Sequence, residues 1–121
     1  MLKMTYTNIL TTFFARFPLL EQKYLEEGDH IFGLPYLVFA FVFVPYIREM
    51  VEKNDVEAII HVCDFLEEMA ICEDDQVCNL MAVGVLEDIL SERALVKTLK
   101  TYIKSKTEEW LLRLEKAYGW G

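Results

Sequence analysis

Residues that break regular structure are scarce in this sequence. Five Gly and three Pro occur in 121 residues, which leaves room for few turns. A β-sandwich of this length would need a turn about every 8 to 12 residues, so long helices fit the chain better. Apolar residues make up 54% and charged residues 26%, a balance that excludes a disordered chain. The composition predicts a single domain, residues 1–121, of the all-α class.

The chain also lacks a hydrophobic run long enough to cross a membrane. Its most hydrophobic stretch, residues 31–47, contains Gly33, Pro35 and Pro45 and falls short of the roughly 20 residues that a bilayer requires. Polar residues close to the N-terminus interrupt any secretory signal. Three cysteines, an odd number, fit reduced thiols better than a disulfide framework. We therefore expect a cytoplasmic protein without membrane contact.

Hydrophobic residues recur at helical spacing through most of the chain. Gly, Pro and short polar segments divide this pattern into separate helices. The expected helices are residues 5–16, 18–27, 36–53 with a kink or restart near Pro45, 55–72, 75–90, 92–104 and 105–118. Residues 28–35 are expected to form a loop, and the tail formed by Trp120 and Gly121 is expected to fray unless Trp120 packs.

Several residues are expected to mark the helix starts. Pro18 fits the first turn of a helix, where its missing N–H costs little. Asn54 and Glu57 have capping-box spacing, in which the first side chain accepts a hydrogen bond from a free backbone N–H and the glutamate reaches back. Ser105 and Glu108 repeat this spacing. The predicted N-terminal caps are Asn54, Ser91 and Ser105.

The two helices expected in the middle of the chain differ in their patterns. Helix 75–90 is apolar nearly all round and should lie at the centre of the fold. Helix 55–72 has one apolar and one polar face. Its apolar face consists of Val56, Ile59, Ile60, Cys63, Leu66 and Met69, and its polar stripe of Glu57, His61, Asp64 and Glu68.

The turns between these helices are only a few residues long. Helix pairs joined by such turns are the units of α-solenoids, in which neighbouring pairs stack. No sequence repeat of fixed period is visible. We predict a short HEAT-like or armadillo-like stack of antiparallel helices, with an orthogonal helical bundle as the alternative.

Positive charge is missing from the middle of the chain. Residues 54–92 hold eleven Asp or Glu and no Lys or Arg, whereas residues 93–121 have a net charge of +4. Such an acidic surface can simply be solvated. Alternatively, carboxylates without counterions repel one another, and a basic partner would relieve the repulsion. A nucleic acid is disfavoured as a direct ligand because its phosphates carry the same sign, and the C-terminal lysines are expected to pair with neighbouring helices rather than bind RNA.

No arrangement typical of an enzyme or a metal site is visible. His61 and Cys63 lie two positions apart on a helix and face different directions, while Cys72 and Cys78 lack the spacing of zinc ligands. No nucleotide-binding or hydrolase motif occurs. We therefore expect no catalysis, no metal and no cofactor; an enzyme would need a deep pocket with a titratable group of shifted pKa. Asn79 is expected to hydrogen-bond a neighbouring turn or to reach a partner.

The segment from Asp64 to Leu90, DFLEEMAICEDDQVCNLMAVGVLEDIL, resembles the central signature of small bacterial immunity proteins. These proteins belong to polymorphic-toxin and contact-dependent growth-inhibition systems. The matching elements are the F-L-E-E helix end, the acidic turn, V-x-N and the hydrophobic V-L-E-D helix, together with the V-P-Y-I run at 44–47. The resemblance covers residues 17–115; Cys78 departs from it, since a polar residue is more usual there.

The resemblance implies a cytoplasmic, HEAT-like immunity protein that neutralises one cognate toxin domain. Such toxins are often nucleases with basic surfaces, in agreement with the charge distribution. The expected partner is a cationic toxin, an RNase, whose active site or substrate groove a monomer of this protein covers. The alternative is a helical-repeat adaptor for an endogenous bacterial protein. The expected partner-binding residues are Glu57, His61, Asp64, Glu68, Asp74, Asp75, Asn79, Glu87 and Asp88. Amide substitution is expected to preserve the fold and slow association at four of them: Asp64, Glu68, Asp74 and Asp75.

Overall fold

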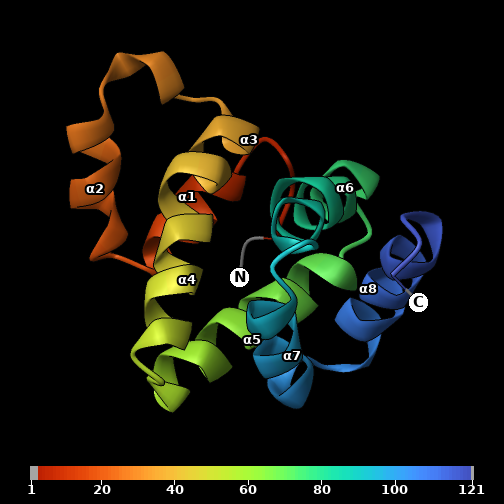
Figure 1. The fold of residues 1–121 in the computed structure, drawn as a ribbon. Coiled ribbons are helices and arrows are strands. Elements are labelled where there is room, and N and C mark those ends of the chain that lie inside the picture. The colour runs from red at the N-terminus through yellow and green to blue at the C-terminus, as the bar shows by residue number, and fades with distance from the viewer. Residues whose placement is uncertain (1–2, 121) are drawn as a thin grey trace.

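The chain folds into helices joined by short turns, drawn in Figure 1 from a computed structural model that describes residues 3–120. Every regular element in this range is helical and none is a strand, so the predicted all-α class is confirmed. The α-helices are α1 (Ile9–Arg16), α2 (Leu20–Glu27), α3 (Pro35–Val38), α4 (Val44–Glu52), α5 (Val56–Ala70), α6 (Asp75–Met81), α7 (Arg93–Tyr102) and α8 (Ser105–Ala117). A 3-10 turn, η1 (Asp29–Ile31), lies in the expected loop, and two π-helical turns are η2 (Phe39–Phe43) and η3 (Ala82–Glu87).

Both long hydrophobic helices contain one of the π-helical turns. The first runs without interruption from α3 through η2 into α4, and the second from α6 through η3 to Ile89. Pro45 lies in the first turn of α4, directly after η2. Because proline has no N–H to bond the carbonyl four residues earlier, the wider turn accommodates it. The helix was expected to kink or restart near Pro45; it continues through a π-helical turn there and does not restart. No proline follows η3 in this way.

Aromatic side chains from α1, η2 and α5 meet in the core. Phe13 of α1 lies at the centre, with its ring centroid 5.0 Å from that of Phe39 and 4.9 Å from that of Phe43. Phe65 of α5 lies 5.9 Å from the same ring. All four rings are fully buried, and their tilted or edge-on contacts are those that aromatic rings favour. This cluster fixes α1 against the first long helix and α5.

Helix α5 occupies the middle of the arrangement. It packs against α4, α6, α7 and α8, and in Figure 1 it runs diagonally across α4 and α7. The α6–η3 helix is also central, as expected, because it contacts η2, α5 and α8 and buries most of its apolar side chains. The fold is a small all-α bundle that combines helix pairs joined by short turns with crossed helices.

The apolar face of α5 differs from the predicted one. Val56 and Ile60, both expected inside, are 39% and 43% exposed. Val62 and Phe65 are buried in their place. The prediction assumed a single apolar stripe, whereas α5 has packed neighbours on several sides.

The first two helices begin later than predicted. Thr5 N donates to Asn8 Oδ1 at 2.8 Å, and Asn8 N donates to Thr5 Oγ1 at 3.3 Å. These reciprocal bonds hold residues 5–8 in a turn, because they satisfy the backbone N–H groups without a helix. The helix therefore starts at Ile9. Pro18 precedes the second helix instead of entering its first turn, since α2 begins at Leu20.

The predicted caps of α5 and α7 are also wrong. The α5 cap is Asp55, whose carboxylate accepts a hydrogen bond from Ala58 N at 3.1 Å. Asn54 lies one residue earlier with a φ of 54°, a left-handed conformation that asparagine tolerates better than most residues. Helix α7 begins at Arg93 without a side-chain cap, so Ser91 does not serve as one.

A carboxylate from another helix caps α8. Ser105 is the first helical residue, and the residue before it makes no capping hydrogen bond. Glu67 of α5 accepts instead from Lys106 N at 3.2 Å and from Thr107 N and Thr107 Oγ1 at 2.9 Å each. This long-range cap replaces the predicted local one and docks α8 on α5.

The described part of the C-terminal tail packs on the protein. Trp120 N donates to the Glu115 carbonyl at 2.7 Å, and the Arg93 guanidinium lies 4.9 Å from the Trp120 ring centroid. Trp120 therefore packs on the protein and does not fray. Gly121 lies outside the described residues.

Candidate functional site

Several carboxylates of residues 54–92 find counterions far away in the sequence. Asp64 of α5 pairs with Lys104 at 2.9 Å. Glu92 binds the Arg48 guanidinium twice, with Nε–Oε1 at 2.9 Å and Nη2–Oε2 at 2.8 Å. For these groups the expectation of missing counterions is wrong, because the fold brings Arg48 from before residues 54–92 and Lys104 from after them. The remaining ion pairs of this region are Glu68 with Arg16 and Glu73 with Lys3.

Other carboxylates of this region stabilise the backbone. Asp55 and Glu67 cap α5 and α8, as described above. Asp74 accepts from Tyr6 N through Oδ2 and from Gln76 N, at the start of α6, through Oδ1, both at 2.9 Å. The hydrogen bond from Tyr6 and then that from Gln76 lower the pKa of Asp74, since both favour the ionised form. Asp74 thus ties the N-terminal turn to α6.

Three of the four predicted partner-binding residues on α5, all except Glu57, make contacts inside the molecule. His61 Nε2 lies 2.8 Å from the Arg16 carbonyl oxygen, and its ring centroid is 4.6 Å from that of Phe17. Asp64 and Glu68, on the same side of the helix, form the ion pairs described above. Amide substitution at these positions would alter contacts of the fold, so they do not separate docking from folding.

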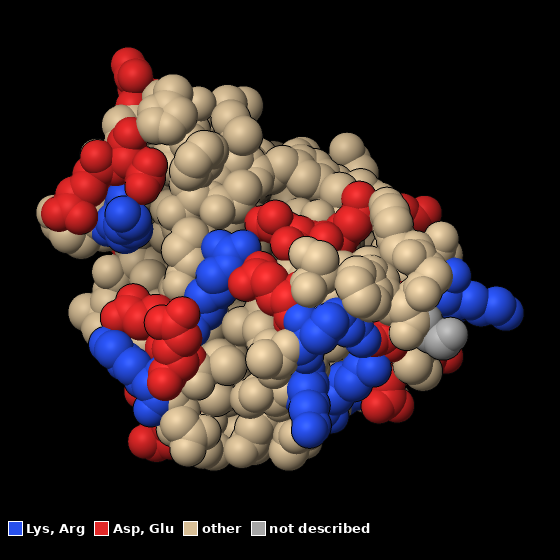
Figure 2. Space-filling model, in the orientation of Figure 1, with Lys and Arg blue, Asp and Glu red and all other residues tan. Residues whose placement is uncertain are grey.

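Five predicted carboxylates have no ion pair within residues 3–120. Asp74 accepts the backbone hydrogen bonds described above, and the other four are Glu57, Asp75, Glu87 and Asp88. Glu57 and Asp75 lie in the first turns of α5 and α6, where negative charge favours a helix. Glu87 and Asp88 lie near the opposite end of a helix, where negative charge is unfavourable. In Figure 2 acidic atoms gather over the α6–η3 segment and over α2, whereas acidic and basic groups lie side by side over α4 and α7.

Glu87 and Asp88 border a groove between the two π-helical turns. The groove has a volume of about 390 Å³, and η2 and η3 pack directly against each other beside it. π-helical turns are frequent at functional sites. The groove is therefore the candidate functional site, and its lining residues are Tyr36, Ala40, Val83, Gly84, Glu87 and Asp88.

Gly84 is buried and lines the groove without contributing a side chain. A Cβ atom at this position would lie 3.0 Å from Leu80 Cδ1, the end of a flexible side chain on the same helix, and 3.6 Å from Tyr36 Cδ1 on α3. The distance to Tyr36 is an ordinary van der Waals contact, so a small side chain here would mainly displace Leu80. A single Gly inside an apolar helical pattern was the sequence signal for this position.

Tyr36 forms one wall of the groove and is held from two sides. Asn79 Nδ2 donates to the Tyr36 hydroxyl at 2.5 Å, and the ring centroid of Tyr6 lies 6.4 Å from that of Tyr36. Asn79 thus bonds a neighbouring helix while its side chain stays exposed. The structure brings three predicted site residues, Asn79, Glu87 and Asp88, together with Tyr36, which was not among the predicted site residues.

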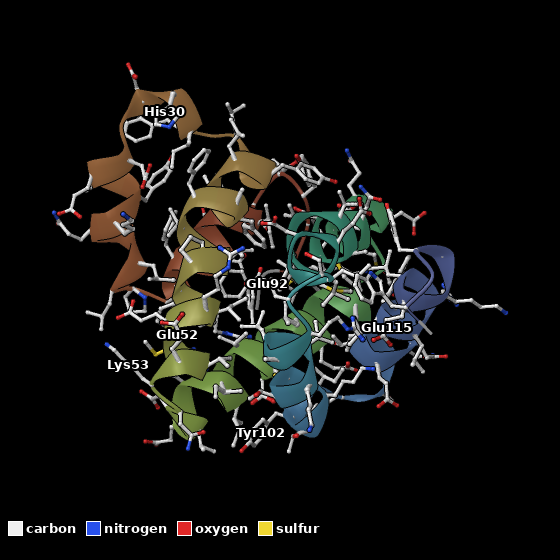
Figure 3. All side chains as sticks on the ribbon, in the orientation of Figure 1. His30, Glu52, Lys53, Glu92, Tyr102 and Glu115 are labelled. Carbon is white, nitrogen blue, oxygen red and sulfur yellow. The ribbon has the colours of Figure 1, made fainter. Side chains whose placement is uncertain are left out.

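The groove carries an excess of negative charge. None of its lining residues is Lys or Arg. A hydrogen bond with Glu92 is the main reason that the pKa of Arg48 is raised, and the charge of Asp88 adds to the shift. Arg48 thus pairs with Glu92 and also lies close enough to Asp88 to interact with its charge, and Figure 3 shows Glu92 between α4 and the start of α7. A hydrogen bond with Glu87 raises the pKa of Tyr118, which places that hydroxyl at the carboxylate.

Comparison with known families assigns nearly the whole chain to one of them. Residues 10–119 match the family described as a domain of unknown function, DUF7674. The chain belongs to this family. No curated protein and no solved structure matches it. The match to DUF7674 covers both long helices, and therefore the entire groove.

A second groove in this DUF7674 domain differs in its charges. It has a volume of about 370 Å³ and lies between α4 and α7. Arg48 and Glu92 line it as a mutual ion pair, and Arg93 pairs with Glu115 of α8. Glu52, labelled with Glu92 in Figure 3, also lines it. The lining therefore contains two Arg and two Glu and has no excess of either sign.

The described residues contain neither a cluster of metal ligands nor a membrane-spanning helix. Among residues 3–120, no three His, Cys, Asp or Glu side chains are grouped so that they could hold a metal ion. No helix in the same range has the length and apolar character needed to span a bilayer.

Cys63 is buried as expected of a core cysteine, and burial raises its pKa to about 12.

Proposed function

We propose that this DUF7674 domain binds a basic protein through the surface formed by α3–η2 and α6–η3. The observation that carries the proposal is the position of Glu87 and Asp88. Two adjacent carboxylates near the C-terminal end of a helix oppose the helix dipole. No Lys or Arg lines the groove, and Arg48, which interacts with the charge of Asp88, is already paired with Glu92. A positively charged partner would remove this cost on binding.

Exposed apolar side chains on the same two helices also favour protein binding. Leu37 and Phe41 are 38% and 43% exposed, and Val83 is 39% exposed. Leu37 and Phe41 directly follow the groove residues Tyr36 and Ala40 in the sequence. Protein interfaces commonly combine buried apolar and aromatic contacts with charged groups that orient the partner. The surface offers both.

We further propose that the basic partner is a toxin domain, and that the protein acts in the cytoplasm as its immunity protein. The resemblance of Asp64–Leu90 to immunity proteins supports this, because the α6–η3 side of the groove lies within that segment. A nuclease, and an RNase in particular, needs a basic surface to bind its substrate. One copy of this protein would cover the active site or that substrate-binding surface.

Identification of the native partner tests the proposal most directly. The protein is purified from its own cells with its partner, the partner is identified by mass spectrometry, and its activity is measured with increasing amounts of this protein. A basic toxin domain that loses activity at a 1:1 ratio would support the proposal. An endogenous protein without toxic activity would favour the adaptor function and overturn the immunity role.

Charge substitutions then test the surface. The double variant Glu87→Gln/Asp88→Asn should slow association with that partner about tenfold at low salt, with less effect at high salt. The control Glu57→Gln/Asp75→Asn makes the same charge change elsewhere and should have a much smaller effect. Equal slowing by both double variants would mean that only the net charge matters, and would overturn the assignment of the surface.

A further inference from the structure

We infer that the groove between η2 and η3 receives one arginine or lysine side chain of the partner. The aliphatic part of that side chain lies between Tyr36 and Val83, and its cationic group lies at Glu87 and Asp88. This inference rests on the proposed function and adds the chemical nature of the group that the groove binds.

The shape of the groove suits a long, narrow side chain. Its volume of about 390 Å³ is too small for an element of secondary structure with its side chains. Ala40 and Gly84 contribute little or no side chain, which leaves the space between the two helices open. Tyr36 and Val83 provide apolar surface, and long basic side chains bury their methylene groups along such surface.

The charged end of the groove suits a cation. Glu87 and Asp88 are neighbours in the sequence, and the negative end of the helix dipole adds to their field. Arg48 is already bound to Glu92 by hydrogen bonds from Nε and Nη2. A guanidinium group offers several N–H donors in one plane and is well suited to two carboxylates. An anion would be repelled here, and a neutral group would leave the carboxylates unpaired.

The Tyr36 ring supports the same ligand. Its position is fixed by the hydrogen bond from Asn79 at 2.5 Å and by the nearby Tyr6 ring. A ring that is held in place loses little conformational entropy when a ligand packs against it. Aromatic faces attract guanidinium and ammonium groups, so an arginine should bind more tightly than a lysine.

A small probe tests the groove without the partner. N-acetyl-arginine amide is titrated into the isotope-labelled protein and followed by backbone amide NMR, with N-acetyl-norleucine amide as an uncharged analogue. We expect saturable shifts confined to residues 36–40 and 83–88, with a Kd on the order of millimolar for so small a ligand. The uncharged analogue should bind at least about tenfold more weakly.

Variants separate the shape of the groove from its charge. Ala40→Leu fills the groove without changing any charge and should abolish the saturable shifts, and Val83→Phe does the same from an exposed position that the fold tolerates. Glu87→Gln/Asp88→Asn should weaken binding at least about tenfold, whereas the control Glu57→Gln/Asp75→Asn should leave it unchanged. Amide spectra outside the groove show whether each variant is folded.

The possible results distinguish this inference from the proposed function. Shifts spread over all acidic positions, or binding that survives both steric variants, would overturn the inference. If partner association depends on Glu87 and Asp88 but tolerates Ala40→Leu, the inference fails while the docking surface stands. If the arginine probe binds in the groove but the partner docks elsewhere, the proposed function fails while the groove retains its preference for a cation.

Discussion

Two sets of carboxylates differ in the contacts that they make inside the protein. One set lies on α5 and α8, and the other lies at the end of η3. Glu115 of α8 is only 2% exposed and is bound by Arg93 and Lys100, and Glu67 of α5 caps a neighbouring helix. Glu87 and Asp88 have no ion pair within the described chain. The same type of side chain therefore holds helices together in one region and is left available in the other.

Glu115 of α8 forms a cluster with Arg93 and Lys100 of α7, and this Glu115 cluster shows how carboxylates stabilise the fold. Burial has the largest single effect on the pKa of Glu115 and raises it, but hydrogen bonds from Lys100 and Arg93 and their charges together lower the pKa below its usual value. The ionised form is therefore favoured inside the fold. Both cations keep part of their side chains in solvent, so the carboxylate depends on the pairing more than they do.

The largest effect is expected from removing this buried carboxylate. Glu115→Ala should lower the free energy of unfolding by about 2 to 3 kcal/mol, less than for a fully buried pair because Arg93 and Lys100 can rehydrate. Urea unfolding monitored by circular dichroism measures this change. The exposed control Glu26→Ala should stay within about 0.5 kcal/mol of the unaltered protein. Similar losses of unfolding free energy for both variants would contradict the proposed difference between the Glu115 cluster and the Glu87–Asp88 pair.

A smaller loss is expected when the cap of α8 is removed. Glu67→Ala leaves the N–H groups of Lys106 and Thr107 without an acceptor and should cost about 1 to 2 kcal/mol. Hydrogen exchange should show the first turn of α8 opening more readily while α1 stays protected. If exchange in α8 were unchanged, another group would have to satisfy these N–H donors. Glu57→Ala on the same helix serves as the control.

Acid should weaken the ion-pair cluster around Glu115. The pKa of Glu115 is lower in the folded state than its usual value of 4.5, so its stabilising contribution is complete above pH 4.5 and is lost as the pH falls through the folded pKa. Glu115→Gln should therefore make the free energy of unfolding less dependent on pH below 4.5. Parallel pH profiles for the variant and the unaltered protein would contradict this.

The smallest effect on stability is expected at the groove. Glu87→Gln/Asp88→Asn should leave the free energy of unfolding unchanged or raise it by a few tenths of a kcal/mol, because the carboxylates oppose the helix dipole. Thermal and urea unfolding give the sign. A loss above about 1 kcal/mol would mean that these carboxylates stabilise the fold, and they would then belong with Glu115 and Glu67.

Local sequence patterns predicted the fold class and part of the helix map. Helical spacing and scarce breakers placed the long helices, and Pro45 marked the irregular turn correctly, because these signals act within a few residues. The cap of α5 was assigned to Asn54 although Asp55 performs it. Adjacent side chains with similar capping preference cannot be ranked without the backbone geometry.

The candidate site was predicted only in part. Asn79, Glu87 and Asp88 were expected to contact a partner, and all three lie at or beside the groove. Tyr36 and Ala40 were not expected there, because their place depends on how the two long helices pack. Asp64 and Glu68 were expected to be available, but Lys104 and Arg16 approach them from distant parts of the chain.

The sequence by itself determined that this chain is helical, that its middle is acidic and that its most apolar helices form the core, since periodicity, charge and burial preference are properties of neighbouring residues. Only the tertiary structure decided which carboxylates are neutralised. Coulomb energy depends on distance in space, and the folded chain brings Lys3, Arg16, Arg48 and Lys104 to acidic residues that lie far away in the sequence. Among the described residues that line the groove between η2 and η3, none is Lys or Arg.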